Sequence, residues 1–296
     1  MKDVMTEQPS LTEQADDPYA SPPVQRAARL LRHIAEGDAV TNISRTAREL
    51  GINRTTLLRL LHTLNIERFI EPRPEGNGWR IGVGLIGLTA QAFFSEDLVQ
   101  VSVPVLTELA DKLGLSAHLG VLDGTEVVYM VRRVPNHAFA SNIRVGSRLP
   151  AHAANMGRII LANLPPARVD RLYPGSILKP VTAHTAITLA KLHAQLESDR
   201  ACGVAWSDGN YEAGISSVAA AVFDATGAPV AALNVSGHSD DFTGTTRRAE
   251  IETAVRMAAA QISRRLGWRD PEPGSRGAAE RADEPKDRRP ATGRVA

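Results

Sequence analysis

Apolar residues recur three or four positions apart in the first part of the chain: Val24, Ala27, Ala28, Leu31 and Ile34. This period predicts an amphipathic helix, which Gly37 ends. A second, shorter helix is predicted to follow, with Ser44 as its cap and with Ala47 and Leu50 on its apolar side. Gly51 then breaks the chain.

A third helix and a hairpin complete this unit. Asn53 is of a residue type favoured at helix N-caps, and the turns after it contain the leucines Leu57, Leu58, Leu60, Leu61 and Leu64. Two short strand-like runs, residues 69–71 and 79–81, then flank a loop rich in proline and glycine. The order of helix, helix, tight turn, helix and hairpin predicts a winged helix-turn-helix over residues 21–81.

The apolar period changes after the hairpin. A linker helix is predicted over residues 82–97, and further helices over 98–113, 156–164, 167–172, 189–202 and 245–266. Runs rich in β-branched residues predict strands at 116–121, 126–134, 217–223 and 230–235. Mixed strands and helices after an α-rich unit predict an α+β fold, in which residues 98–268 form a domain with a mainly antiparallel sheet.

Composition limits the class of protein. A length of 296 residues favours two domains, and the polar segments 1–20 and 269–296 are predicted to be disordered tails. The single cysteine, Cys202, cannot form an internal disulfide. The chain has neither an apolar run of membrane-spanning length nor an apolar signal region near its start. We therefore expect a cytoplasmic protein with no membrane partner.

Charge is unevenly distributed along the chain. The net charge is +1, but residues 24–80 contain ten arginines, no lysine and six acidic residues. A basic segment of this kind suits a polyanionic partner. A solvated arginine-rich surface explains the charge equally well. Charge alone therefore does not establish a polyanionic partner, and it needs the support of a DNA-binding motif.

The start of the third predicted helix provides that support. A recognition helix presents its N-terminal residues to base edges in the major groove of double-stranded DNA. Arginine can bond two acceptors of guanine, and a threonine methyl can contact the thymine methyl. Arginines on neighbouring elements, and the exposed start of the second helix, suit phosphates. The predicted DNA-binding residues are Ser44, Arg45, Asn53, Arg54, Thr55, Thr56, Arg59, Arg73 and Arg80.

Motifs for other functions are weak. Residues 82–87 match GxGxxG, but a dinucleotide site also needs a βαβ unit and an acidic residue about 20 positions later. We interpret the glycines as a helix start packed closely on the wing. The chain contains no GxSxG, HExxH, CxxC or phosphate-loop motif. We therefore expect no catalytic residues, no metal and no cofactor.

Several segments resemble the IclR family of bacterial regulators. Residues 54–64 and 79–82 resemble its DNA-binding part. In the second domain, residues 145–153 resemble the family segment "vGxrlPlha", residues 182–185 "TprT" and residues 214–220 "GlrsiAaP". Residues 155–158 and 232–236 are similar to segments of one branch, the regulators of protocatechuate and β-ketoadipate catabolism, with Asn155 in place of the usual serine.

The resemblance implies a GAF-like effector domain, assembly as a dimer or a dimer of dimers, and control by a small carboxylate, either an aromatic acid or a dicarboxylate. Transferred position by position, it implies that Asn155 and Met156 supply backbone N–H groups at a helix start, where carboxylates bind well. The other implied effector-binding residues are the polar Ser207, Ser217, Asn234 and Ser236 and the apolar Leu149 and Ile215. The family often has an acidic residue at the position of Ser207, so serine there favours an anionic or dianionic ligand.

Two functions from different classes remain open at this stage. The first is a sequence-specific DNA-binding transcriptional regulator controlled by a small organic acid. The second is a metabolic enzyme that binds a small molecule and uses its N-terminal helices for assembly.

Overall fold

The computed structural model describes residues 19–88, 97–135, 143–175, 177–183, 185–209 and 214–269. The predicted tails lie almost entirely outside these ranges, as do residues 89–96 of the predicted linker helix, of which residues 83–88 are helical. Contacts divide the chain into two units between Gln100 and Val101. No helix in the described ranges is long and apolar enough to cross a membrane.

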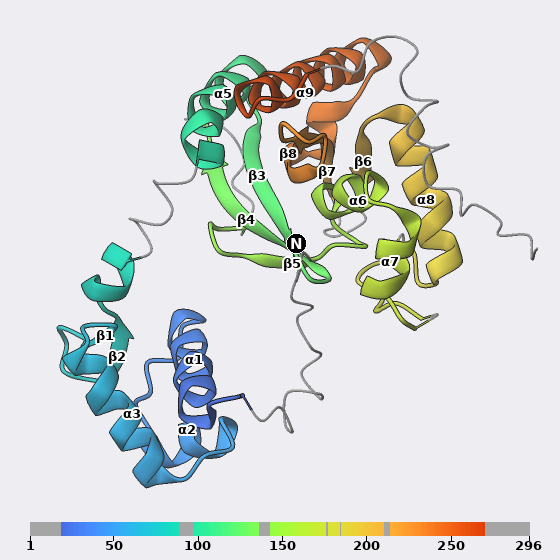
Figure 1. Cartoon of the computed structure of the whole chain (residues 1–296). Helices are drawn as coiled ribbons and strands as arrows, with labels where there is room; N and C mark the ends of the chain where they lie inside the picture. Colours follow the sequence, from blue (N-terminus) through green and yellow to red (C-terminus); the bar gives the residue numbers. More distant parts are fainter. Residues whose placement is uncertain are drawn as a thin grey trace, which may run out of the picture. The chain divides into compact units, whose positions relative to one another are not determined.

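In its described ranges the N-terminal unit contains three helices and a two-stranded hairpin, which helical residues 83–88 follow (Figure 1). Its elements are α1 (Pro22–Ala35), α2 (Ile43–Glu49), α3 (Arg54–Ile66), β1 (Ile70–Pro72) and β2 (Trp79–Ile81). One hydrophobic cluster fills it, made of Leu30, Ile34, Val40, Ala47, Leu57, Leu61, Leu64 and Ile70. Burying a side chain of this kind contributes about 1.5–3 kcal/mol. Because the cluster contains residues of both α2 and α3, it stabilises the tight turn between these helices.

Asparagines cap the starts of α2 and α3. Asn53 Oδ1 accepts the N–H of Thr56 at 2.7 Å, as predicted. The prediction of Ser44 as the cap of α2 is wrong, because Asn42 Oδ1 accepts the N–H of Arg45 at 3.0 Å. Asn42 has the extended backbone that a cap requires, which leaves Ser44 within the first turn of the helix.

The GxGxxG segment packs against the hairpin. Gly82 donates its N–H to the Phe69 carbonyl at 2.8 Å, and Gly84 donates to the Arg68 carbonyl at 2.9 Å. A Cβ atom at Gly82 would lie 2.3 Å from the Arg68 oxygen, which is too close for any side chain. The first two glycines therefore permit a close approach of two backbones, in agreement with the interpretation of a helix start packed on the wing.

The C-terminal unit contains a six-stranded sheet in its described ranges, with the order β5-β4-β3-β8-β7-β6. The strands are β3 (Ser116–Asp123), β4 (Glu126–Arg133), β5 (Arg148–Pro150), β6 (Ala205–Asp208), β7 (Ile215–Phe223) and β8 (Pro229–His238). Each pairing in this sheet is antiparallel, which confirms the predicted α+β fold. The edge strands β5 and β6 were not predicted, because three or four residues show too little alternation.

Helices pack on both faces of this sheet (Figure 1). Both α6 (Asn155–Ala162) and α9 (Thr245–Arg265) contact β7 and β8. Ala219 and Ala221 of β7 lie in the hydrophobic cluster that contains α6, and successive strand residues face opposite sides, so Ala220 faces away from α6. The remaining elements are α5 (Asp97–Leu113), α7 (Pro166–Leu172), α8 (Leu189–Cys202) and the 3₁₀-helix η2 (Ser239–Phe242).

Candidate DNA-binding and effector sites

The start of α3 is presented to solvent. Arg54, Thr55 and Arg59 are exposed, and Thr56 is half-buried beside the Asn53 cap. The opposite side of the helix carries the buried leucines of the core. One face of the helix therefore packs against the protein core, and the other is exposed in the way that a helix entering a groove of DNA requires.

The other predicted DNA-binding arginines are engaged within the chain. Arg45 bonds Asp38, Arg80 pairs with Glu71 at 2.6 Å, and Arg73 donates to the Trp79 carbonyl at 3.4 Å. Among the described residues, Arg54 and Arg59 form no ion pair. Exposed ion pairs contribute only about 0–1 kcal/mol, so a phosphate can replace the carboxylate partner of Arg45 or Arg80. Arg54 and Arg59 of α3 have no ion pair to break before they bind DNA.

A cavity in the C-terminal unit brings together seven of the eight residues predicted for effector binding. It is lined by Tyr129, Ile143, Leu149, Ala154, Asn155, Ser207, Ile215, Ser217, Asn234 and Ser236. Met156, the second residue of α6, does not line it, because its side chain is fully buried in the hydrophobic core. The cavity volume is about 40 Å³, which is small for a ligand site.

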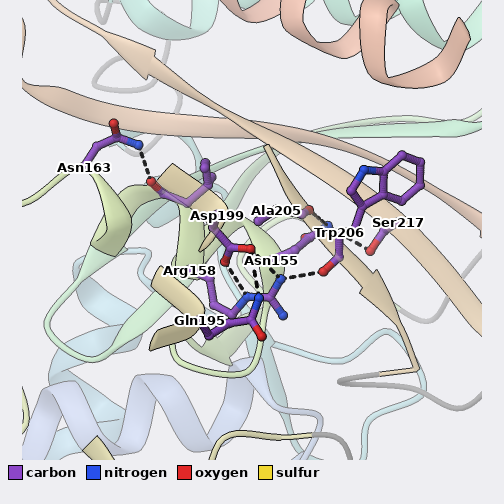
Figure 2. Close-up of polar contacts among 9 residues, drawn as sticks. Asn155, Arg158, Asn163, Gln195, Asp199, Ala205, Trp206 and Ser217 are labelled. Carbon is purple, nitrogen blue, oxygen red and sulfur yellow. Dashed lines mark hydrogen bonds and ion pairs between the residues drawn. The ribbon is translucent and has the colours of Figure 1, made fainter. Parts of the chain in front are cut away.

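The Asn155 side chain, rather than only its backbone, forms part of this site (Figure 2). Asn155 Nδ2 donates to the Ala205 carbonyl at 3.3 Å and to Ser217 Oγ at 3.0 Å. Asn155 Oδ1 accepts from Asn234 Nδ2 at 3.1 Å. A carbonyl can only accept, so Ala205 determines the orientation of the Asn155 amide. The Asn155 amide thereby connects α6 to β6, β7 and β8.

His118 extends this network on β3, opposite Asn234 on β8. Its Nδ1 lies 3.0 Å from Asn234 Oδ1, and this oxygen must accept because the Asn234 nitrogen donates to Asn155. His118 Nδ1 therefore carries the proton. Burial lowers the pKa of His118 to about 4, so the ring is neutral at neutral pH. The sequence offered no signal for this residue, because the contact spans 116 positions.

We expect the C-terminal unit to lose stability as the pH falls from about 6.5 to 4. In this window the unfolded chain binds a proton that buried His118, with its pKa lowered to about 4, does not. The contribution of neutral His118 to the free energy of unfolding is fully present above the pKa of histidine in the unfolded chain. It decreases by on the order of 3 kcal/mol as the pH falls towards 4. Urea unfolding at several pH values measures it. His118→Gln has no titrating ring and should show a shallower pH dependence; equal slopes would contradict the assignment.

A buried ion pair connects α6 to α8 (Figure 2). Arg158 Nε lies 2.9 Å from Asp199 Oδ2 of α8, with both side chains almost wholly buried. Arg158 also donates to the Trp206 carbonyl of β6, and Gln195 donates to Asp199 at 3.1 Å. Burial raises the pKa of Asp199, and the charge of Arg158 opposes that rise. The pair joins α6 to α8 and β6, and sequence reasoning missed it.

The two units match two parts of one protein family. Residues 90–264 match the bacterial transcriptional regulator IclR C-terminal family, and residues 23–74 match the IclR helix-turn-helix domain. The chain belongs to the IclR family. Its match to the C-terminal family covers more than half of its length, in agreement with the resemblance seen in the sequence.

Individual members of the IclR family are similar over nearly their whole length. The HTH-type transcriptional regulator XynR of Escherichia coli K12 is 30% identical over 83% of this chain and 97% of XynR. The transcriptional repressor IclR of the same organism is 27% identical over 82% and 89%. The structure of an IclR transcriptional regulator from Alicyclobacillus acidocaldarius has a TM-score of 0.75 at 27% identity, covering 84% of this chain and 100% of that one.

Membership of the IclR family decides between the two functions left open by the sequence. The protein is an IclR-family DNA-binding transcriptional regulator with an effector-binding domain, and it is not an enzyme. The hypothesis of a metabolic enzyme is therefore set aside. Family membership leaves the chemical class of the effector to be argued from the cavity.

Proposed function

We propose that this IclR-family regulator reads its operator with the N-terminal end of α3 and is controlled by a small monocarboxylate bound beside α6. The observation that carries the proposal is the exposed start of α3, where Arg54, Thr55 and Arg59 face solvent. The proposed DNA contacts comprise base readout from α3 and phosphate contacts from Ser44, Arg45, Arg73 and Arg80.

The lining of the cavity supports a monocarboxylate. The side chains that line it in the described ranges are amide, hydroxyl, phenol or apolar groups, with no charged group among them. Ala154, the N-cap of α6, provides no side-chain cap, so the first N–H groups of the helix can receive one carboxylate. A second buried carboxylate would have no positive partner and would cost several kcal/mol. We therefore favour a monocarboxylate over the dicarboxylate that the resemblance also allowed.

An aromatic monocarboxylate satisfies this charge requirement but needs more room. Drug-sized ligands occupy several hundred Å³, against about 40 Å³ here. A thermal-shift screen of matched pairs, butyrate with succinate and benzoate with terephthalate, tests charge and size separately. An effector at 100 times its Kd adds about 2.7 kcal/mol of stability. Stabilisation by the dicarboxylates alone would contradict the proposed class.

Ser207→Asp is expected to weaken binding of the effector acid at least tenfold. Ser207 is buried and lines the cavity, so an aspartate there places a negative charge close to the bound carboxylate. Ser207→Asn, which is uncharged and similar in size to aspartate, is the matched control. Isothermal titration calorimetry compares the two variants, and equal affinities would show that charge at this position has no role.

Operator binding is tested with the promoter next to the protein's own gene. A gel shift at several salt concentrations should show specific binding that weakens as salt rises, because phosphate contacts release counterions. We propose that two copies bind together, which predicts an inverted repeat with half-sites one helical turn apart or a multiple of it. Absence of binding at low salt, or binding without a salt slope, would refute operator recognition by α3.

A further inference from the structure

Three side chains of metal-ligating type converge in the N-terminal unit. They are His33 of α1, Asp38 of the turn after α1 and Glu49 of α2. His33 Nε2 lies 3.4 Å from Asp38 Oδ2 and 3.7 Å from Glu49 Oε2, and one ligand atom of each lies within 4.8 Å of the others. Ligands held tetrahedrally at about 2.0–2.1 Å from Zn²⁺ are about 3.3–3.4 Å apart, so the two distances from His33 are already close to ligand spacing.

The imidazole nitrogen points to a missing cation. His33 Nε2 is shielded from solvent and has no hydrogen-bond partner in the described part of the chain, although the side chain as a whole is 20% exposed. A buried polar atom of this kind costs about 1–3 kcal/mol if it stays unsatisfied. A cation bound between the three groups would take this nitrogen as a ligand and offset the negative charge of the two carboxylates.

Arg45 competes for the same carboxylates. It bonds Asp38 Oδ2, and its Nε lies 3.6 Å from Glu49 Oε1. One arginine therefore faces two carboxylates in this cluster. A divalent ion would neutralise both carboxylates and use the imidazole nitrogen that Arg45 does not contact.

We propose that His33, Asp38 and Glu49 bind a divalent transition metal, for which Zn²⁺ is the reference ion. One imidazole nitrogen and two carboxylate oxygens are ligands that this ion uses, and three protein ligands leave a fourth position for water. Binding takes both carboxylates away from Arg45 and releases its guanidinium to solvent. Arg45 is one of the proposed phosphate contacts, so this second step rests on the proposed function and links metal to DNA affinity.

This cluster cannot be recognised from the sequence, since its members are 5 and 11 positions apart and match no metal motif. The expectation of no metal was drawn from the absence of HExxH and CxxC spacing. Only the tertiary fold of the N-terminal unit brings the three side chains together, which explains why a search by motif could not find them.

Calorimetry with zinc chloride tests the metal site on the full chain. A Cys202→Ser background removes the exposed thiol, which would bind zinc by itself. We expect one Zn²⁺ per chain, with at least tenfold weaker binding in His33→Ala and in Glu49→Gln. We choose Glu49 rather than Asp38 for substitution because Asp38 also accepts the N–H of Val40 and supports the turn after α1. His62→Ala removes an exposed histidine of the same unit and should change nothing. Absence of binding, or equal affinity in His33→Ala, overturns the site.

The release of Arg45 has its own readout. With zinc bound, the slope of log affinity for operator DNA against log salt should steepen by about 0.9, the value of one added phosphate contact, and Arg45→Ala should abolish that increment. Zinc binding with an unchanged slope would overturn the link between metal and DNA. Zinc binding in a protein that binds no DNA would refute the proposed function and leave the metal site standing.

Discussion

Arg158→Met is expected to lower the free energy of unfolding of the C-terminal unit by about 3–5 kcal/mol. Methionine fills much of the space of the arginine side chain, but it leaves the Asp199 carboxylate buried without a positive partner. It also removes the bond that Arg158 donates to the Trp206 carbonyl. Urea unfolding followed by tryptophan fluorescence measures the loss, because Trp206 and Trp268 lie in this unit.

The matched control for this variant is an exposed arginine in the same unit. Arg148 bonds both Asp123 and Glu126, and its side chain is 45% exposed. Arg148→Met should therefore cost about 1 kcal/mol or less. The double variant Arg158→Met, Asp199→Leu removes both buried charges and should be more stable than Arg158→Met alone. Similar losses in Arg148→Met and Arg158→Met would mean that burial of the pair has no special importance.

Replacing both Arg54 and Arg59 by alanine is expected to weaken operator binding by about 2–6 kcal/mol. Each arginine that bonds a base contributes about 1–3 kcal/mol. Both side chains are exposed, so stability should change by no more than about 0.5 kcal/mol. A gel shift on operator DNA, together with urea unfolding, separates lost recognition from lost folding.

An arginine of the other unit serves as the control for charge. Arg264 is exposed on α9, and Arg264→Ala removes one positive charge from the chain without altering α3. It should leave the gel shift unchanged. The double variant could instead bind operator DNA and unrelated DNA with the same affinities as the parent protein. In that case α3 does not read the operator, and the base contacts must come from another element.

Local rules account for what was predicted correctly in the N-terminal unit. The spacing of the leucines determined the buried face of α3, and the preference of asparagine for caps determined where that helix begins. The same rules failed at α2, where Ser44 was chosen although Asn42 lies two residues earlier. Both residue types are good caps, so only the backbone conformation decided between them.

Contacts over long sequence separations account for what was missed in the C-terminal unit. His118 and Asn234 are 116 positions apart, and Arg158 and Asp199 are 41 apart. Their pairing depends on the register of β3 with β8 and on the packing of α6 against α8. Periodicity within one segment carries no information about either.

The amino-acid sequence by itself determined the succession of the longer helices and strands, the exposed arginines at the start of α3 and the family to which the chain belongs. Each depends on residues close together in the chain or on ordered motifs. Tertiary structure alone decided that the Asn155 side chain lines the cavity beside α6, that Arg158 is buried against Asp199, and that His33 meets two carboxylates. These depend on which surfaces pack together, because a buried polar group takes its partner from whichever element lies against it.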